Sequence, residues 1–220
     1  ILGEDYLSKS GEFIYSETNT LRKGDVYLLG ANPGSSPDDK TKRTIKEDLE
    51  NFESTTINKT LDENWGKNKI SKKPLQNRLV SLIPNLLNKN FRDICQSNLI
   101  FARSVDLNSL DDFNFHAKKC WPCHKLILDI IQPKLILSNG SGENRSAYSY
   151  INKNFEVNNL EWREHGSTSA SWKIFNTTIL KRETIVAAFP HLSRFDVQNN
   201  IERIKWFKQR IEGRMNSLKI

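Results

Sequence analysis

Two polar side chains that follow apolar runs are the first candidates for chemistry. Asn32 lies in the turn Gly-Ala-Asn-Pro-Gly at 30–34, and His191 lies in Pro-His-Leu-Ser at 190–193. Open α/β sheets place their active sites at the carboxyl ends of strands. The two positions therefore predict an amide and an imidazole at one edge of a sheet. A strand-to-helix turn without chemistry, or a histidine that satisfies a turn, would show the same residues.

Asn32, His191 and Asn98 together suit the hydrolysis of an N-glycosidic bond. Breaking this bond leaves negative charge on the departing base and positive charge on the sugar. An enzyme therefore needs a donor at the base oxygen and a water on the opposite face of the sugar. His191 can supply the donor, and the amide oxygen of Asn32 can hold the water without acting as a strong base. Asn98 offers a donor and an acceptor to the Watson–Crick edge of an extruded base, unless backbone groups satisfy it.

The elements that must position these side chains follow from the apolar pattern. Strands are predicted at 26–29, 95–101, 134–140, 172–180 and 184–189. Helices are predicted after Asp38-Asp39, from Pro74, from Cys120, and in a final segment with Val197 and Ile201 facing inward. Residues 142–170 are polar and predict a surface insertion with a weak helix around 147–151. We expect one α/β domain over residues 1–220, a three-layer α/β/α sandwich with a short, mostly parallel central sheet.

The charge of the chain favours a polyanionic partner. Lys and Arg number 33 against 26 Asp and Glu, which gives a net charge of +7 and a pI near 9.3. A basic loop follows Trp65, an aromatic side chain that can either anchor the loop or stack on a base. We expect phosphate contacts from Lys69, Lys72 and Lys73.

The cysteines and the hydropathy profile bear on cofactors and location. Three cysteines are an odd number, which is typical of a reducing compartment. The Cys-x-x-Cys-His segment at 120–124 resembles a metal or haem signal, but it lacks the second pair that a zinc or iron–sulfur site needs. No apolar run approaches the ~20 residues of a membrane span, and no signal-peptide pattern is found. We expect a monomer without metal, cofactor or membrane partner, in the cytoplasm or, in a eukaryote, the nucleus.

The two turns together resemble the uracil-DNA glycosylase superfamily. The turn at 30–34 is similar to the first motif of its mismatch-specific and single-strand-selective branches, Gly-x-Asn-Pro-Gly. The segment 190–193 is similar to the second motif, His-Pro-Ser, with Leu192 where proline is usual. The resemblance spans about residues 25–210. The cysteines of the iron–sulfur branch are not all present.

This resemblance implies catalytic roles for Asn32 and His191. It also implies a base-binding pocket and a group of DNA contacts, including a wedge that fills the gap in the duplex. The base-binding residues are Gly30, Ala31, Pro33, Gly34 and Asn98; the DNA contacts are Leu192, Ser193, Arg194 and Phe195. Phe195 could equally belong to the core of the last helix.

The function expected from this resemblance is monofunctional DNA glycosylase activity in DNA repair. Such an enzyme flips out uracil or another modified pyrimidine and leaves an abasic site. Three alternatives stay open. The atypical Leu192 and the insertion at 142–170 favour a glycosylase for a bulky hypermodified base in viral DNA, acting in phage defence. A second is an inactive nucleic-acid-binding protein of the same fold. The third, an enzyme acting on free nucleotides, ranks last because the 30–34 turn has no phosphate-binding lysine.

Overall fold

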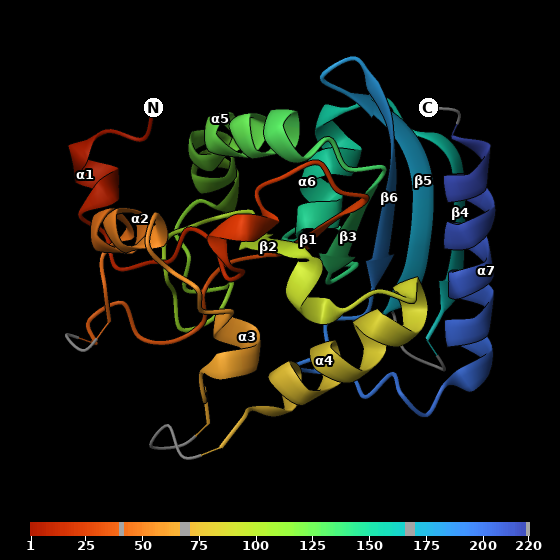
Figure 1. Cartoon of the computed structure of the whole chain (residues 1–220), viewed down its shortest axis with the longest axis horizontal. Coiled ribbons are helices and arrows are strands. Elements are labelled where there is room, and N and C mark those ends of the chain that lie inside the picture. The colour runs from red at the N-terminus through yellow and green to blue at the C-terminus, as the bar shows by residue number, and fades with distance from the viewer. Residues whose placement is uncertain (40–41, 67–70, 166–169, 219–220) are drawn as a thin grey trace.

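A six-stranded sheet forms the centre of the computed structural model, which describes residues 1–39, 42–66, 71–165 and 170–218 (Figure 1). The strand order is β2-β1-β3-β6-β5-β4. β2, β1, β3 and β6 pair in parallel, whereas β5 and β4 add antiparallel strands at one edge. The α/β class is therefore confirmed, and the parallel arrangement holds for four of the strands. The strands are β1 (Val26–Gly30), β2 (Cys95–Asn98), β3 (Leu135–Asn139), β4 (Asn158–Glu164), β5 (Ser171–Ile179) and β6 (Arg182–Phe189).

Helices cover both faces of this sheet because β1 is apolar on both faces. Successive side chains of a strand point to opposite sides. Tyr27 and Leu29 pack in one core with α5 and α6, while Val26 and Leu28 pack in a second core with α4 and α7. The helical elements are α1 (Glu4–Leu7), η1 (Thr18–Thr20), α2 (Ile45–Phe52), α3 (Lys59–Asp62), α4 (Pro74–Leu87), η3 (Phe91–Asp93), α5 (Phe113–Ile131), α6 (Ala147–Asn154) and α7 (Ile201–Ser217).

The four parallel strands bring the predicted site residues to one edge of the sheet. Gly30 of β1 is in register with Asn98 of β2, and Asn139 of β3 is in register with Phe189 of β6. Asn32 and His191 each follow the end of one of these strands. Parallel pairing therefore places residues that are far apart in the sequence beside a common crevice.

Helix α4 begins at Pro74, as predicted, but two other helix starts differ from the prediction. Thr44, not Asp38-Asp39, caps α2, because its side chain accepts from the backbone of Glu47 in a capping box. Asp112 caps α5, which begins seven residues before Cys120. The Cys-x-x-Cys-His segment therefore lies inside a helix and not at its start.

The prediction for residues 142–170 was also incomplete. The helix predicted around 147–151 is present as α6, but the segment also contains the edge strand β4, in which most side chains are exposed. An exposed edge strand lacks the apolar alternation that makes a strand visible in a sequence. In α7 the inward placement of Ile201 was wrong, since its side chain is 74% exposed in the first turn.

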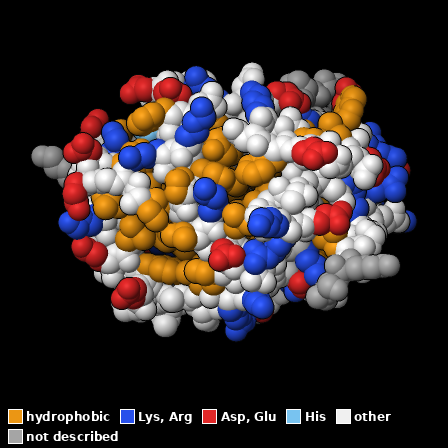
Figure 2. All heavy atoms as spheres, turned by 90° about the horizontal axis from the view of Figure 1, so that it is seen from above, with side chains coloured by type: hydrophobic (Ala, Val, Ile, Leu, Met, Phe, Trp, Pro, Cys, Tyr) orange, Lys and Arg blue, Asp and Glu red, His pale blue; other side chains and the backbone are white. Residues whose placement is uncertain are grey.

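The outer face of α5 carries exposed apolar side chains. Phe115, Leu126 and Ile130 are each about half exposed. Figure 2 looks onto the side where α5 and α6 lie uppermost in Figure 1, and hydrophobic side chains gather there among Lys and Arg. Within the described part of the chain, no helix combines the length and apolar character that crossing a membrane requires.

Leu192 belongs to the core beneath α4 and α7, where its side chain is fully buried. We expect Leu192→Ala to lower the free energy of unfolding by about 2–5 kcal/mol, because the lost contacts leave a cavity. Leu126→Ala, at a position 55% exposed, is the matched control and should change stability by no more than about 0.5 kcal/mol. Urea unfolding followed by circular dichroism measures both, and equal stabilities would contradict the core position of Leu192.

Candidate active site

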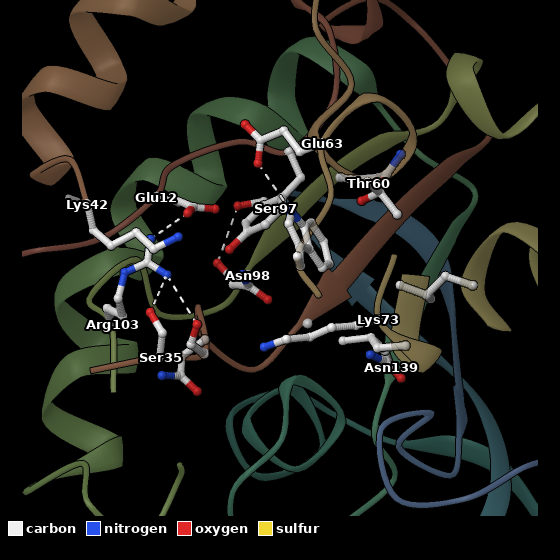
Figure 3. Close-up of a pocket in the computed structure, with 18 of the residues that line it drawn as sticks. Glu12, Ser35, Lys42, Thr60, Glu63, Lys73, Ser97, Asn98, Arg103 and Asn139 are labelled. Carbon is white, nitrogen blue, oxygen red and sulfur yellow. Dashed lines mark hydrogen bonds and ion pairs between the residues drawn. The ribbon is translucent and has the colours of Figure 1, made fainter. Parts of the chain in front are cut away.

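A pocket of about 370 Å³ lies at the carboxyl ends of β1 and β2 (Figure 3). Five residues predicted from the sequence line it: Gly30, Asn32, Gly34, Lys73 and Asn98. Further lining residues, which sequence reasoning left unassigned to the site, include Glu12, Thr60, Glu63, Arg103 and Asn139. The pocket thus joins the ends of three strands with the start of α4.

The amide of Asn32 has a defined orientation. Its Nδ2 donates to the hydroxyl of Ser104 at 2.7 Å and to the carbonyl of Pro33 at 3.0 Å. The hydroxyl proton of Ser104 is itself donated to the carbonyl of Asp106, 2.6 Å away. Ser104 can therefore only accept from Asn32, which directs Nδ2 to Ser104 and leaves Oδ1 as a free acceptor. Among the described residues nothing donates to that oxygen.

Arg103 fixes the turn that carries Asn32. This arginine is 6% exposed, and one terminal nitrogen donates to the carbonyl of Gly34 and the hydroxyl of Ser35, each at 3.2 Å. Its other terminal nitrogen forms an ion pair with Glu12. Burial by itself would raise the pKa of the Glu12 carboxyl, but Lys59 and Arg103 lower this pKa below its usual value. Glu12 therefore stays ionised and holds the guanidinium in place.

Asn98 lies against Gly30 at the floor of the pocket. A Cβ on residue 30 would come within 2.0 Å of the Oδ1 of Asn98, so only glycine fits there while the amide keeps this position. The Asn98 amide has no hydrogen bond to any part of the chain that the structure describes. The Asn98 amide is therefore available to a ligand, and its role in reading a base stays a prediction.

A buried glutamine of α4 holds the opposite wall. The Oε1 of Gln76 accepts from the backbone nitrogens of Trp65 and Lys73, each at 3.0 Å. Its Nε2 donates to the carbonyls of Thr60 at 3.0 Å and Glu63 at 2.7 Å. All four partners line the pocket. Gln76 shares the buried face of α4 with apolar side chains, and a polar residue in such a stripe is the sequence signal that could have revealed it.

Trp65 is therefore part of the pocket and not only the anchor of a loop. Its indole packs edge-on against Tyr15, with ring centroids 5.7 Å apart, and the indole nitrogen donates to Glu63 at 3.2 Å. These contacts leave an aromatic surface among the lining residues. Aromatic faces of this kind bind bases by stacking.

His191 lies beside the pocket and does not line it. The Nδ1 of His191 accepts from the backbone nitrogen of Ser193 at 3.3 Å, which leaves the ring proton on Nε2. Burial, together with the positive charge of Arg194, lowers the pKa of His191 to about 4. The ring is therefore a neutral donor at pH 7. Asn139 connects it to the pocket, since its Oδ1 accepts from the backbone nitrogen of Leu192 at 3.1 Å.

The segment after His191 differs from the prediction of a four-residue DNA contact. Leu192 is fully buried and so cannot be inserted into a duplex. Phe195 is half-buried against the second core, edge-on to His165 with centroids 5.8 Å apart. Ser193 and Arg194 are exposed and stay available for DNA. The carbonyl of Leu192 accepts from Arg78 of α4 at 2.7 Å, which fixes this turn.

The other residues predicted for the site are three lysines of the basic loop and two residues of the Asn32 turn. The amine of Lys72 donates to the carbonyls of Thr60, Leu61 and Glu63, so it is occupied within the fold and the phosphate contact predicted for it is withdrawn. Lys69 lies outside the described residues. The amine of Lys73 extends into the pocket, beneath Asn98 in Figure 3, and pairs with no group in the described chain. Ala31 and Pro33 are buried in the turn and shape it through their backbone.

The Cys-x-x-Cys-His segment serves the core. The ring of His124 is fully buried between the hydroxyl of Tyr27 and the carbonyl of Leu99, each at 2.9 Å, and burial lowers its pKa to about 4. Cys95, Cys120 and Cys123 are buried free thiols. The described residues contain no group of three or more His, Cys, Asp or Glu side chains arranged to hold a metal ion.

Comparison of the sequence with protein-family models and with curated proteins finds no match. The geometry of the pocket and its neighbouring turns is therefore the basis for assigning a function.

Ser104 should control the activity of this site through the orientation of Asn32. We expect Ser104→Ala to lower turnover about 10²-fold with little change in KM, because a misplaced reactive group typically costs that much. Ser104→Thr keeps a hydroxyl and should restore much of the rate. Single-turnover kinetics measure this, and an unchanged rate in the alanine variant would show that Ser104 does not orient Asn32.

The lowered pKa of His191 predicts an unusual pH profile. An ordinary histidine gains its proton near pH 6.5, whereas His191 stays neutral down to about pH 4. Turnover should therefore lack a step near pH 6.5 and change only close to pH 4, where a proton on Nδ1 breaks the hydrogen bond from the backbone nitrogen of Ser193. The folded state binds fewer protons than the unfolded state between these values, so stability decreases as pH falls through this window. Circular dichroism at each pH separates unfolding from loss of turnover.

Proposed function

We propose that this chain is a monofunctional DNA glycosylase with a fold like that of the uracil-DNA glycosylases. It would flip uracil or another modified pyrimidine out of DNA and hydrolyse its N-glycosidic bond. The observation that carries the proposal is the pairing of two asparagines in one pocket. Asn32 presents a fixed acceptor, and Asn98 presents an amide without a partner among the described residues. The resemblance of the two turns to the motifs of that superfamily adds support.

The proposed reaction assigns one role to each group. Asn98 binds the Watson–Crick edge of the extruded base, and Trp65 offers a surface for stacking. The Oδ1 of Asn32 holds a water whose oxygen attacks C1′ of the sugar. The base leaves with the bonding electron pair, and the Nε2 proton of His191 stabilises the negative charge that develops on its oxygen. The attacking water releases its proton to solvent and the departing base anion takes one from solvent, so an abasic site and a free base remain.

Lys73 and the exposed pair Ser193 and Arg194 would contact the DNA around this pocket. The amine of Lys73 extends into the pocket, where a cation favours the phosphate of an extruded nucleotide (Figure 3). Arg194 is exposed directly after the histidine turn. With Leu192 buried, Arg194 is the better candidate to occupy the gap left in the stack.

The size of the pocket favours a second candidate substrate. Its volume of about 370 Å³ falls in the range that holds drug-sized ligands and exceeds the needs of a bare pyrimidine ring. The polar side chains of Glu12, Thr60 and Glu63 also line it, and they can bond hydroxyl groups. A bulky hypermodified base of viral DNA is therefore the alternative substrate, with a role in phage defence in place of repair.

Replacing the two proposed catalytic residues tests the activity. We expect Asn32→Ala and His191→Ala each to lower excision by about 10²–10³-fold, the usual cost of losing one transition-state contact. DNA affinity should stay nearly unchanged. The assay uses oligonucleotides that each carry one modified base, with hot alkali to cleave abasic sites. If both variants excise at the wild-type rate, the active site lies elsewhere. A wild type that binds DNA without excising any base would instead favour an inactive DNA-binding protein.

The role of Lys73 is tested by the salt dependence of DNA binding. A phosphate contact releases condensed counterions, so Lys73→Gln should reduce the slope of log K against log salt by about 1 for every DNA sequence. The matched control is Lys181→Gln. Lys181 is exposed in the turn between β5 and β6, at the opposite end of the strands from the pocket. Fluorescence anisotropy from low to moderate salt measures the slopes. Identical slopes for wild type and Lys73→Gln would remove this contact.

A further inference from the structure

Strand β4 ends the sheet with an open edge and two exposed apolar side chains. Within the described chain it pairs only with β5, on the side of the sheet where α7 lies (Figure 1). Leu160 is 47% exposed and Trp162 is 57% exposed. The sequence of β4, Asn-Asn-Leu-Glu-Trp-Arg-Glu, contains neither the proline nor the lysine that commonly protects an edge strand from pairing. This edge is therefore open to a further strand.

The pairing of β4 with β5 fixes which backbone groups face the open edge. The nitrogen of His165 donates to the carbonyl of Ala170 at 2.8 Å, so these two residues form a hydrogen-bonded pair that continues the two strands. Hydrogen-bonded and non-hydrogen-bonded pairs alternate along antiparallel strands, so Arg163 and Glu161 also direct their backbone groups toward β5. The backbone groups that point outward are those of Leu160, Trp162 and Glu164.

The side chains of β4 divide between the two faces of the sheet. Glu161 forms ion pairs with two arginines of α7, and the guanidinium of Arg163 lies 5.0 Å from the ring centroid of Trp206 in the same helix. Successive side chains of a strand point to opposite faces. Leu160 and Trp162 therefore lie on the face away from α7.

A second copy of β4 is the partner whose charges fit this edge. When two copies pair in antiparallel orientation about a twofold axis, outward backbone groups must meet outward groups, which allows the axis to pass at residue 161, 162 or 163. An axis at 161 would oppose Glu161 to itself, and an axis at 163 would oppose Arg163 to itself. An axis at Trp162 instead places each Glu161 opposite Arg163 of the second copy. Opposite charges directly across two strands stabilise their pairing, and like charges destabilise it.

We propose that two copies of this chain associate through β4, in antiparallel orientation and with the twofold axis at Trp162. Hydrogen bonds then join the two Trp162 residues, and Leu160 of each copy bonds Glu164 of the other. The carbonyl of Glu164 accepts from Arg203 of α7 at 3.0 Å and keeps a second lone pair for this bond. The two Trp162 side chains meet on the face away from α7, where each covers apolar surface of the other.

The dimer leaves the candidate site open. The pocket lies at β1 and β2, and β4 is at the opposite edge of the sheet. The joined sheet therefore carries one pocket near each of its two outer edges. The inference goes beyond the proposed function and does not depend on it. It departs from the monomer expected from the sequence, where β4 was not predicted.

Sedimentation velocity without DNA tests the association. A pairing of about five residues a side buries less area than a standard interface, so we expect a dissociation constant on the order of 10 µM. Between ~1 and ~100 µM the wild type should shift from the 25.5 kDa chain to twice that mass.

Charge reversal tests the register. Arg163→Glu places Glu opposite Glu161, and Glu161→Arg places Arg opposite Arg163, so each variant alone should associate at least about tenfold more weakly. An equimolar mixture of the two variants should form dimers again, because each copy then meets its complement.

The matched control is Lys125→Glu, at an exposed position of α5, which changes the net charge as Arg163→Glu does and should dimerise like the wild type. A melting curve establishes that each variant is folded, since Glu161→Arg also loses the ion pairs with α7. If that variant does not fold, Trp162→Pro replaces it. Proline removes an outward N–H while the bonds to β5 remain, and it should also prevent association.

A wild type that stays monomeric at the highest concentration would overturn the inference. Either single variant dimerising as well as the wild type would place the contact on another face, and folded variants whose mixture stays monomeric would reject the pairing of Glu161 with Arg163. Arg163→Glu should keep the wild-type excision rate, because Arg163 lies outside the pocket. Dimers of a chain that excises no base would contradict the glycosylase and leave this inference standing.

Discussion

The hydrogen bond from Asn32 to Ser104 is the contact on which the candidate site depends. An amide can face either way at little cost, and only its oxygen can accept a hydrogen bond. Ser104 decides the orientation because its own proton is committed to the carbonyl of Asp106. Behind this contact, Arg103 holds the same turn through Gly34 and Ser35 and is held in turn by Glu12. A buried guanidinium with a paired carboxylate is costly to form, and breaking such a pair is costlier still.

Helix α4 connects the two halves of this arrangement. Gln76 ties the wall that contains Trp65 and Lys73, while Arg78, two residues further along, binds the carbonyl of Leu192 in the histidine turn. One rigid element therefore fixes both the pocket wall that contains Trp65 and the turn that carries His191. Sites built on helices and strands hold their geometry better than sites built on loops alone. The packing of α4 against the sheet, through Leu79, Leu82 and Ile83, thus contributes directly to the site.

The predictable part of this molecule is the part that local pattern determines. The apolar runs of β1 and β3 predict strands because both faces of these strands are buried. Pro74 predicts the start of α4 because proline has no N–H and fits only the first turn of a helix. The Asn32 turn was visible for the same reason. Strand β4 was not, because an exposed edge strand has no apolar face. Ser104 and Glu12 could not be assigned to the site, because their roles arise from tertiary hydrogen bonds. Leu192 and Lys72 were misjudged because a side chain's burial or occupation depends on neighbours that are distant in the sequence.

The strand order has a further consequence for how the site comes into existence. Asn32 and His191 follow β1 and β6, Asn98 ends β2, and β1 is joined to β6 only through β3. Each of these parallel pairings closes a long stretch of chain, so the contacts form slowly and depend on one another. A partly folded chain that lacks any one of these pairings therefore contains an incomplete site. A chain still emerging during synthesis, with β6 not yet paired, would have the pocket floor but no imidazole beside it, so the site is complete only when β6 has joined the sheet.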